Sequence, residues 1–270
     1  MTRILVTGAT GPLGQHTISR LLARKHHVRI LTHQAIPSPQ PDVEMASGDL
    51  VTGEGLEAAL DGIEVVIHLA SDSRQALATD VGGTRNLLAA ATAAQAARPA
   101  PPHIVYISIV GVDRSNMPYY VAKHAAEALI AASRLPYSIL RATQFHGFIA
   151  AILRSLGIDT QPEIAVPAGV RAQSVAVGEV AERLVALAEL GPLGHIAAIG
   201  GPEALDLETM ARTYLRVRDP ARAAQVQAHT EPIESPMYDA WRTGCNLAPD
   251  HAFGVMTWEE YLTQSLPPRR

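Results

Sequence analysis

Short apolar runs alternate with amphipathic stretches over residues 3–199. The apolar runs are rich in β-branched residues, which is typical of strands buried in a sheet. Between them, apolar side chains recur every three or four positions, which indicates helices. We expect strands over 3–7, 27–32, 43–46, 64–70, 103–108, 137–141 and 195–199, and helices over 12–25, 55–60, 80–97, 119–133 and 178–189.

The alternation of strands and helices carries the fold prediction. No hairpin signal joins successive strands, and strand–helix–strand units form parallel sheets with right-handed crossovers. The pattern is less regular after Phe148, where we expect helices over 207–216 and 258–266. The sequence therefore predicts an α/β fold, a Rossmann-type doubly wound parallel sheet with a small C-terminal substrate-side subdomain.

A chain of 270 residues suits one large α/β domain, and no low-complexity linker divides it. We expect a single domain over residues 1–270. Its Rossmann core takes up about residues 1–150 and 177–200, and the substrate-side segments take up about residues 151–176 and 201–270.

Composition narrows the class of protein. A hydrophobic content of 47% and a charged content of 18% are typical of a well-packed globule. With a net charge of −4 and no basic block, we expect no nucleic-acid partner. No apolar run reaches the roughly 18 residues that a membrane helix needs, and no signal peptide is recognisable. Cys245 is the only cysteine, so a cytoplasmic location without an internal disulfide is expected.

Two further expectations concern ligands and assembly. The sequence contains neither His-x-x-x-His nor Cys-x-x-Cys spacing, so we expect no metal site. The expected partner is a small-molecule substrate, with no membrane surface involved. The choice between a monomer and a homodimer stays open.

A glycine-rich turn lies between the first predicted strand and helix. Gly8, Gly11 and Gly14 have the spacing Gly-x-x-Gly-x-x-Gly, and Pro12 suits a first helical turn. In dinucleotide-binding units, such glycines permit a tight turn, a close approach of the pyrophosphate and close helix–strand packing. The helix N-terminus then offers N–H groups and a positive dipole end to the phosphates. An ordinary turn is the alternative, but the flanking strand and helix favour a nicotinamide dinucleotide site.

This glycine spacing resembles that of the short-chain dehydrogenase/reductase superfamily. Gly48-Asp49-Leu50 resembles its loop after the third strand, where Asp contacts adenine, and 68–71 resembles the strand end beside the adenosine ribose. Residues 80–88 resemble the opening of the superfamily's fourth helix. Similarity to the atypical, NmrA-like members extends over 106–113, 118–123, 139–146, 166–169, 177–180 and 200–203. That group includes reductases of several substrates and nucleotide-sensing regulators.

Tyr119 and Lys123 lie four positions apart, so they share one face of a predicted helix. The resemblance implies that Tyr119 protonates a carbonyl oxygen as hydride arrives. It also implies that Lys123 holds the nicotinamide ribose and lowers the phenol pKa from its reference of about 10. Reductases also place Ser or Thr beyond the fifth strand, but Ile109 and Val110 occupy that slot here, and we expect Ser108 to point elsewhere. Tyr119 is therefore an acid, a substrate-stacking ring or a structural residue.

The end of the second strand bears on the choice of cofactor. An acidic residue there would bind the ribose diol of NAD, but Leu31-Thr32-His33-Gln34 has none. Because Thr32 and His33 could bind a 2′-phosphate, NADP(H) is favoured over NAD(H), although His33 could also be an ordinary polar loop residue. The expected cofactor contacts are Gly8, Thr10, Gly11, Pro12, Leu13, Gly14, Thr32, His33, Asp49, Leu50, Leu69, Ala70, Ser71, Ser108 and Lys123.

Ligands of open α/β sheets bind beyond the carboxyl ends of the strands. We therefore expect the substrate to contact Val110, Tyr119, Gln144, Phe145 and His146. His146 is either an alternative proton donor, with a reference pKa of about 6.5, or a hydrogen-bonded loop residue.

Two functions from different classes follow from these sites. The first is an NAD(P)H-dependent oxidoreductase that transfers hydride to a small apolar or quinone-like organic acceptor. The second is a non-catalytic NADP(H)-sensing regulator that acts through a protein partner. An epimerase or imine reductase on the same scaffold also stays open.

Overall fold

The computed structural model describes residues 1–33, 42–95, 100–195 and 197–265. The chain divides into two compact units. The first unit comprises Met1–Ser108, Pro118–Arg141 and Val177–Ala197, and the second comprises Ile109–Met117, Ala142–Ala176 and Ala198–Arg270.

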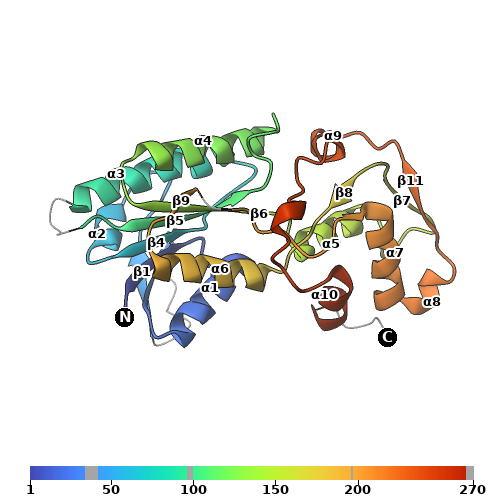
Figure 1. The fold of residues 1–270 in the computed structure, drawn as a ribbon, viewed down its shortest axis with the longest axis horizontal. Coiled ribbons are helices and arrows are strands. Elements are labelled where there is room, and N and C mark those ends of the chain that lie inside the picture. The colour runs from blue at the N-terminus through green and yellow to red at the C-terminus, as the bar shows by residue number, and fades with distance from the viewer. Residues whose placement is uncertain (34–41, 96–99, 196, 266–270) are drawn as a thin grey trace. The chain divides into compact units, whose positions relative to one another are not determined.

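Within the described residues, a seven-stranded sheet forms the centre of the first unit (Figure 1). Its strands are β1 (Arg3–Thr7), β2 (His27–Thr32), β3 (Val43–Ser47), β4 (Val65–His68), β5 (His103–Ile109), β6 (Tyr137–Ala142) and β9 (Gly194–His195). They lie in the order β3-β2-β1-β4-β5-β6-β9, and the pairings run parallel. This order is the one that creates a dinucleotide crevice where the strand sequence reverses beside β1. The predicted Rossmann-type parallel sheet is therefore confirmed.

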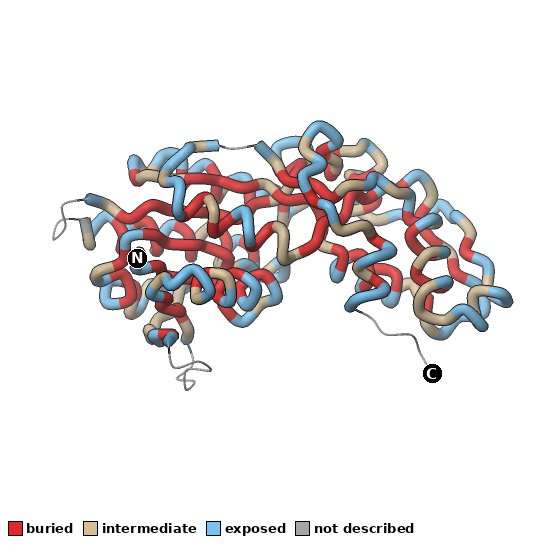
Figure 2. Tube along the Cα trace, turned by 60° about the horizontal axis from the view of Figure 1, so that its bottom comes forward, coloured by how far each residue is buried: buried red, intermediate tan, exposed pale blue. Residues whose placement is uncertain are grey.

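Helices cover both faces of this sheet (Figure 1). Helices α3 (Gly83–Gln95) and α4 (Pro118–Ala132) lie on one face, and α1 (Pro12–Ala23) and α6 (Val177–Leu190) lie on the other. The short helix α2 (Leu56–Leu60) packs beside α3. Strands β1, β2, β4, β5 and β6 are buried over most of their length (Figure 2), which explains their largely apolar sequences. Among the described helices, none is both long and apolar enough to traverse a lipid bilayer.

The segment that opens α3 differs from its prediction. The helix expected from Asp80 begins at Leu77 as a π-helix, η1 (Leu77–Gly82), and continues into α3. Asp80 is fully buried there, and its Oδ2 accepts a hydrogen bond from the backbone N–H of Asp72. A buried aspartate interrupts the repeat of apolar residues from which helices are predicted, so the hydrophobic pattern did not reveal the π-helical turn. The wider π turn is a feature often found at functional sites.

The second unit contains the two helices predicted over 207–216 and 258–266, together with most of the elements that the sequence pattern did not predict. Its helices are α5 (His146–Ser155), α7 (Leu207–Arg218), α8 (Pro220–Ala223), α9 (Pro236–Arg242), the 3-10 helix η2 (Pro249–His251) and α10 (Trp258–Ser265). Strand β7 (Ile164–Pro167) pairs in parallel with β11 (Ala228–Glu231), and β8 (Arg171–Ala172) pairs antiparallel with β10 (Leu205–Asp206). The predicted strand 195–199 is reduced to β9 and a single bridge between Ile199 and Ala142.

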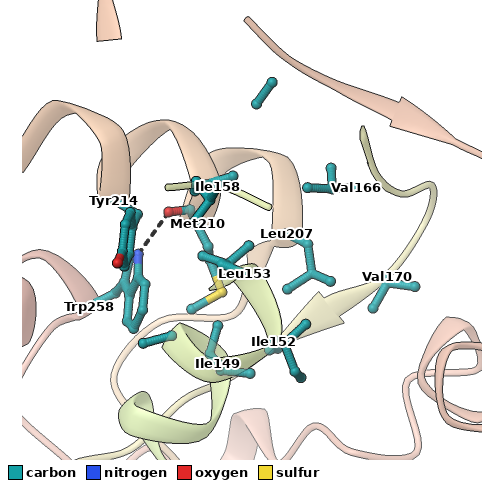
Figure 3. Close-up of a cluster of buried hydrophobic side chains, with 14 of the residues drawn as sticks. Ile149, Ile152, Leu153, Ile158, Val166, Val170, Leu207, Met210, Tyr214 and Trp258 are labelled. Atoms are coloured by element: carbon teal, nitrogen blue, oxygen red, sulfur yellow. Dashed lines mark hydrogen bonds between the residues drawn. The ribbon is translucent and has the colours of Figure 1, made fainter. Parts of the chain in front are cut away.

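The second unit has its own apolar core (Figure 3). Ile149 and Leu153 of α5 pack there with Met210 of α7 and Trp258 of α10. The indole Nε1 of Trp258 donates a hydrogen bond to the Met210 carbonyl oxygen at 3.0 Å. The ring is therefore buried with its polar atom satisfied, which fixes α10 against α7.

Candidate functional site

The glycine turn between β1 and α1 holds two positions that exclude any larger side chain. Gly8 has a φ of +69°, and a Cβ at this position would lie 2.6 Å from the backbone nitrogen of Ala70. A Cβ at Gly14 would lie 2.4 Å from the Gly8 carbonyl oxygen and 2.6 Å from the Ala9 Cα. Gly8 thus permits the tight turn, and Gly14 lets α1 pack against it.

Gly11 differs from its two neighbours in the turn. It has a φ of −73° and precedes Pro12 at the start of α1. A Cβ there would meet only the Gly8 carbonyl oxygen, at 3.6 Å, so packing within the chain does not require glycine. Within the described residues, no side-chain hydrogen bond caps this end of α1 and its first turn carries no acid. The open backbone and the uncapped N–H groups fit a diphosphate.

The loop after β3 is anchored to α3. Asp49 Oδ1 accepts hydrogen bonds from the backbone N–H groups of Val51, at 2.6 Å, and Thr52, at 3.4 Å. Asn86 Nδ2 donates to the carbonyl oxygens of Leu50, at 2.9 Å, and Val51, at 3.0 Å. These bonds fix the segment for which we predicted adenine contact, and that contact stays a prediction.

The end of β2 places the two residues expected near a 2′-phosphate. Thr32 is the last residue of β2 and is half-buried, and His33 follows it with an exposed side chain. Gln34 lies outside the described residues.

A buried polar network fixes the end of β4. Thr7 Oγ1 accepts hydrogen bonds from the backbone N–H groups of Leu69 and Ala70, each at 3.2 Å, and lies 2.7 Å from His68 Nδ1. The other ring nitrogen of His68 lies 3.1 Å from Thr84 Oγ1. Burial lowers the pKa of His68 to about 3, so the imidazole is neutral. The backbone that leads to Ser71 is thereby held in place.

Lys123 is buried at the centre of the candidate site. Its Nζ donates a hydrogen bond to the Ile107 carbonyl oxygen at 2.9 Å and lies 3.5 Å from Asp80 Oδ1. The ammonium also lies 4.2 Å from the centroid of the Tyr106 ring. Burial lowers the pKa of Lys123, and the Asp80 carboxylate opposes this shift. Sequence reasoning missed Asp80, although it stands in the segment 80–88 that resembles the family's helix opening.

Tyr119 occupies the first turn of α4 and is half-buried. Its Oη lies 2.8 Å from the Oγ of Ser71, which follows β4. Burial raises the pKa of Tyr119, the hydrogen bond with Ser71 opposes this rise, and Asp80 and Asp72 add to it. This rise is opposite to the lowering of the phenol pKa that the resemblance implies for Lys123, whose ammonium is paired with Asp80, and that role of Lys123 stays a prediction. The phenol stays protonated at neutral pH, as an acid must.

The slot for a third catalytic hydroxyl holds Ile109 and Val110, which belong to the second unit. Ser108, the last residue of β5 in the first unit, is 1% exposed. Its Oγ has no hydrogen-bond partner among the residues that the structure describes. The sequence predicts Ser71 only as a cofactor contact and gives no sign of its contact with Tyr119.

The other residues predicted to contact substrate belong to the second unit. Val110 is buried, and its backbone N–H donates to the Ala142 carbonyl oxygen at 2.9 Å. Gln144 is buried as well, and its Oε1 accepts a hydrogen bond from Asn246 Nδ2 at 3.2 Å. Phe145 is the N-cap of α5, and its backbone bridges to Val175.

His146 begins α5 and is 1% exposed. Its Nδ1 lies 2.7 Å from Ser174 Oγ, and its Nε2 lies 3.1 Å from the Met256 carbonyl oxygen. The ring stacks on Tyr261 with centroids 5.0 Å apart. With both nitrogens engaged and the ring buried, these contacts favour the alternative of a hydrogen-bonded histidine over a proton donor.

Comparisons with known proteins agree with this fold and turn. A family model described as NAD(P)H-binding matches residues 8–188. Among solved structures, the NADPH-dependent quinone oxidoreductase of Escherichia coli, complexed with NADPH, superposes with a TM-score of 0.80 at 18% identity. The superposition covers 97% of this chain and 99% of that one. At this identity, the likeness shows the fold alone.

Relatives found by sequence match parts of the chain at higher identity. The 3 beta-hydroxysteroid dehydrogenase/Delta 5→4-isomerase of Mycobacterium tuberculosis is 35% identical over 100 residues, which is 32% of this chain and 27% of that protein. The chain thus spans about a quarter of that relative's length. The (4-alkanoyl-5-oxo-2,5-dihydrofuran-3-yl)methyl phosphate reductase of Streptomyces griseus is 27% identical over 227 residues, covering 79% of this chain and 73% of that protein.

Proposed function

The chain belongs to the NAD(P)H-binding family, and we propose that it is an NADPH-dependent reductase of a small apolar or quinone-like organic acceptor. The observation that carries this proposal is the pair of Tyr119 and Lys123 on one face of α4. The phenol is half-buried and protonated, and the ammonium is buried in an ion pair with Asp80. A non-catalytic nucleotide sensor does not need Tyr119 and Lys123 together on one helix face.

The residues of the first unit suit NADPH along its length. The diphosphate would be held by the backbone around Gly11 and the N–H groups that open α1. The adenosine would lie near Asp49 and the backbone after β4, and its 2′-phosphate near Thr32 and His33. Lys123 would bind the nicotinamide ribose. When bound, the reduced nicotinamide supplies a hydride to the acceptor.

The chain itself supplies the proton. Tyr119 Oη donates its hydrogen to the acceptor oxygen as the hydride arrives, which neutralises the developing negative charge. The raised pKa keeps the phenol protonated at neutral pH, so a proton is available for this step. A quinone-like acceptor is included because it can be reduced with little help from an acid.

The proposal is tested by mixing the protein with NADPH and a panel of quinones and activated carbonyls. Oxidation is followed by the absorbance of the reduced nicotinamide. We expect Tyr119→Phe to lower kcat for a carbonyl acceptor by about 100-fold or more while the affinity for NADPH is kept. Tyr137→Phe is the matched control, because Tyr137 lies on β6 and contacts His195 instead. NADPH binding without oxidation of any acceptor would overturn the proposal and favour the sensing regulator.

The preference for NADP(H) rests on the absence of an acid in the sequence 31–34 at the end of β2. A ligand that binds only the folded state raises the melting temperature, and at equal concentration the tighter ligand raises it more. We expect NADP to stabilise the chain more than NAD does at equal concentration. Stronger stabilisation by NAD would reverse the assignment.

A further inference from the structure

Two hydroxyl groups meet at the carboxyl edge of the sheet in the first unit. Ser71 Oγ lies 2.8 Å from Tyr119 Oη, although the two residues are 48 positions apart in the sequence. Ser71 leaves a strand end whose backbone is fixed by Thr7, and Tyr119 stands in the first turn of α4. Tyr119 is therefore held by a helix, and Ser71 directly follows two residues whose backbone is fixed, which favours a defined geometry for this hydrogen bond.

The groups that face the Tyr119 hydroxyl decide how easily it loses a proton. Asp80 lies on η1 and Asp72 lies in the segment after β4. The negative charge of each carboxylate disfavours the tyrosinate form of Tyr119. Tyr106 on β5 is a further acidic group nearby, and its phenol is neutral. The charge of Lys123, from α4 itself, is balanced by Asp80. Ser71 is thus the neighbour whose hydrogen bond favours the tyrosinate.

We propose that Ser71 is a positioning residue that replaces the hydroxyl missing beyond β5, and that it donates a hydrogen bond to the Tyr119 oxygen during proton transfer. This inference rests on the proposed reductase function. In the reaction, the Oη–H bond of Tyr119 breaks and an O–H bond forms on the acceptor, which also gains a hydride with its electron pair. Tyr119 regains its proton from solvent in one concerted relay: the Ser71 Oγ–H proton moves to the tyrosinate oxygen as Ser71 Oγ, on an exposed side chain, takes a proton from hydronium or buffer acid.

A measurement without cofactor or acceptor tests the inference directly. The chain is labelled with isotope-enriched tyrosine, and the Cζ resonance of Tyr119 is titrated with pH, the signal being assigned from its loss in Tyr119→Phe. We expect the pKa of Tyr119 to rise in Ser71→Ala and to return toward the original value in Ser71→Thr. Ser133→Ala, which removes a hydroxyl just beyond the far end of α4, is the matched control. An unchanged pKa in Ser71→Ala would overturn the inference, even if no acceptor were ever found.

Kinetics provide the second readout once an acceptor is known. Ser71→Ala should lower kcat by about tenfold or more, leave the Kd for NADPH unchanged, and move the alkaline limb of the kcat profile to higher pH. Ser71→Thr should restore most of kcat. If Ser71→Ala weakens NADPH binding and leaves kcat unaltered, Ser71 is a cofactor contact and the inference is wrong. Because the variants are compared with an active parent chain, this outcome cannot be confused with failure of the reductase proposal.

Discussion

Lys123 and Asp80 form a buried ion pair, with Nζ 3.5 Å from Oδ1 and with side chains 3% and 0% exposed. The carboxylate is brought inward by the π-helix η1, and its second oxygen accepts the backbone N–H of Asp72. Lys123 Nζ also donates a hydrogen bond to the Ile107 carbonyl oxygen. The pair therefore links α4, η1 and β5 in the first unit.

Replacing Asp80 by Asn should destabilise the first unit and change the acidity of Tyr119. The variant leaves the Lys123 ammonium buried without its counter-charge, and breaking such a pair costs about 3–5 kcal/mol. Because the Asp80 charge raises the pKa of Tyr119, that pKa should fall in the variant. Chemical denaturation measures the first effect, and tyrosine titration measures the second. Asp72→Asn is the control, because it removes a carboxylate near Tyr119 that is outside this ion pair. It should lower the pKa of Tyr119 with little loss of stability. Equal losses of stability in Asp80→Asn and Asp72→Asn would contradict the prediction.

The glycines of the β1–α1 turn should respond differently to the same substitution. Alanine is a better helix former than glycine by about 1 kcal/mol, but a Cβ at Gly14 lies 2.4 Å from the Gly8 carbonyl oxygen. We therefore expect Gly14→Ala to reduce the free energy of unfolding by about 2 kcal/mol or more. Gly11→Ala meets no such contact, so stability should change by less than about 1 kcal/mol while NADPH affinity falls about tenfold or more. Denaturation measures the stability of each variant, and fluorescence titration with NADPH measures its affinity. Unchanged affinity in Gly11→Ala would show that the diphosphate does not bind at this turn.

The sheet of the first unit was predictable because its signals are local. β1, β4, β5 and β6 are buried apolar runs that a helix follows, and the turn at Gly8 is marked by glycines. The second unit was less predictable, because β8 and β10 are two residues long and their pairing of Arg171 with Asp206 joins distant segments. Strands so short have no periodicity to detect.

The candidate site was predictable only in part. The spacing of Tyr119 and Lys123 places them on one helix face, and the structure confirms that helix as α4. The contact of Ser71 with Tyr119 depends on which strand lies beside which, and a single sequence does not state this. Asp80 was missed for a different reason, since an acid is seldom buried unless a partner such as Lys123 is brought to it.

An acid in place of His33 should shift the cofactor preference. His33 is exposed directly after β2, so a carboxylate there would repel a 2′-phosphate and accept hydrogen bonds from a ribose diol. We expect His33→Asp to lower the ratio of NADP to NAD affinity by about tenfold or more. His27→Asp makes the same change of charge at the opposite, exposed end of β2 and should leave the ratio intact. Equal ratios in both variants would indicate that the 2′-phosphate lies elsewhere.

Two buried histidines should make the chain lose stability in acid. Burial lowers the pKa of His68 to about 3 and that of His103 to about 4, against an ordinary value of 6.5. Between pH 6.5 and about 4, the unfolded chain therefore binds more protons than the folded one, and the free energy of unfolding falls as pH falls. Each histidine contributes up to about 1.4 kcal/mol per pH unit in that window. This contribution to the free energy of unfolding is complete above pH 6.5. It is lost as the pH falls toward the pKa values that the two histidines have in the folded chain.

Denaturation curves recorded from about pH 7 down to about pH 5 measure this slope. His68→Asn should make it shallower, because the asparagine side chain does not titrate and can still bond Thr7. His103→Gln should do the same, since its amide can reach Ser138 as the imidazole Nε2 does. Exposed His27→Gln is the matched control and should leave the slope as it is. If the slope were equally steep without His68 and His103, groups other than these two rings would control the acid sensitivity of the first unit.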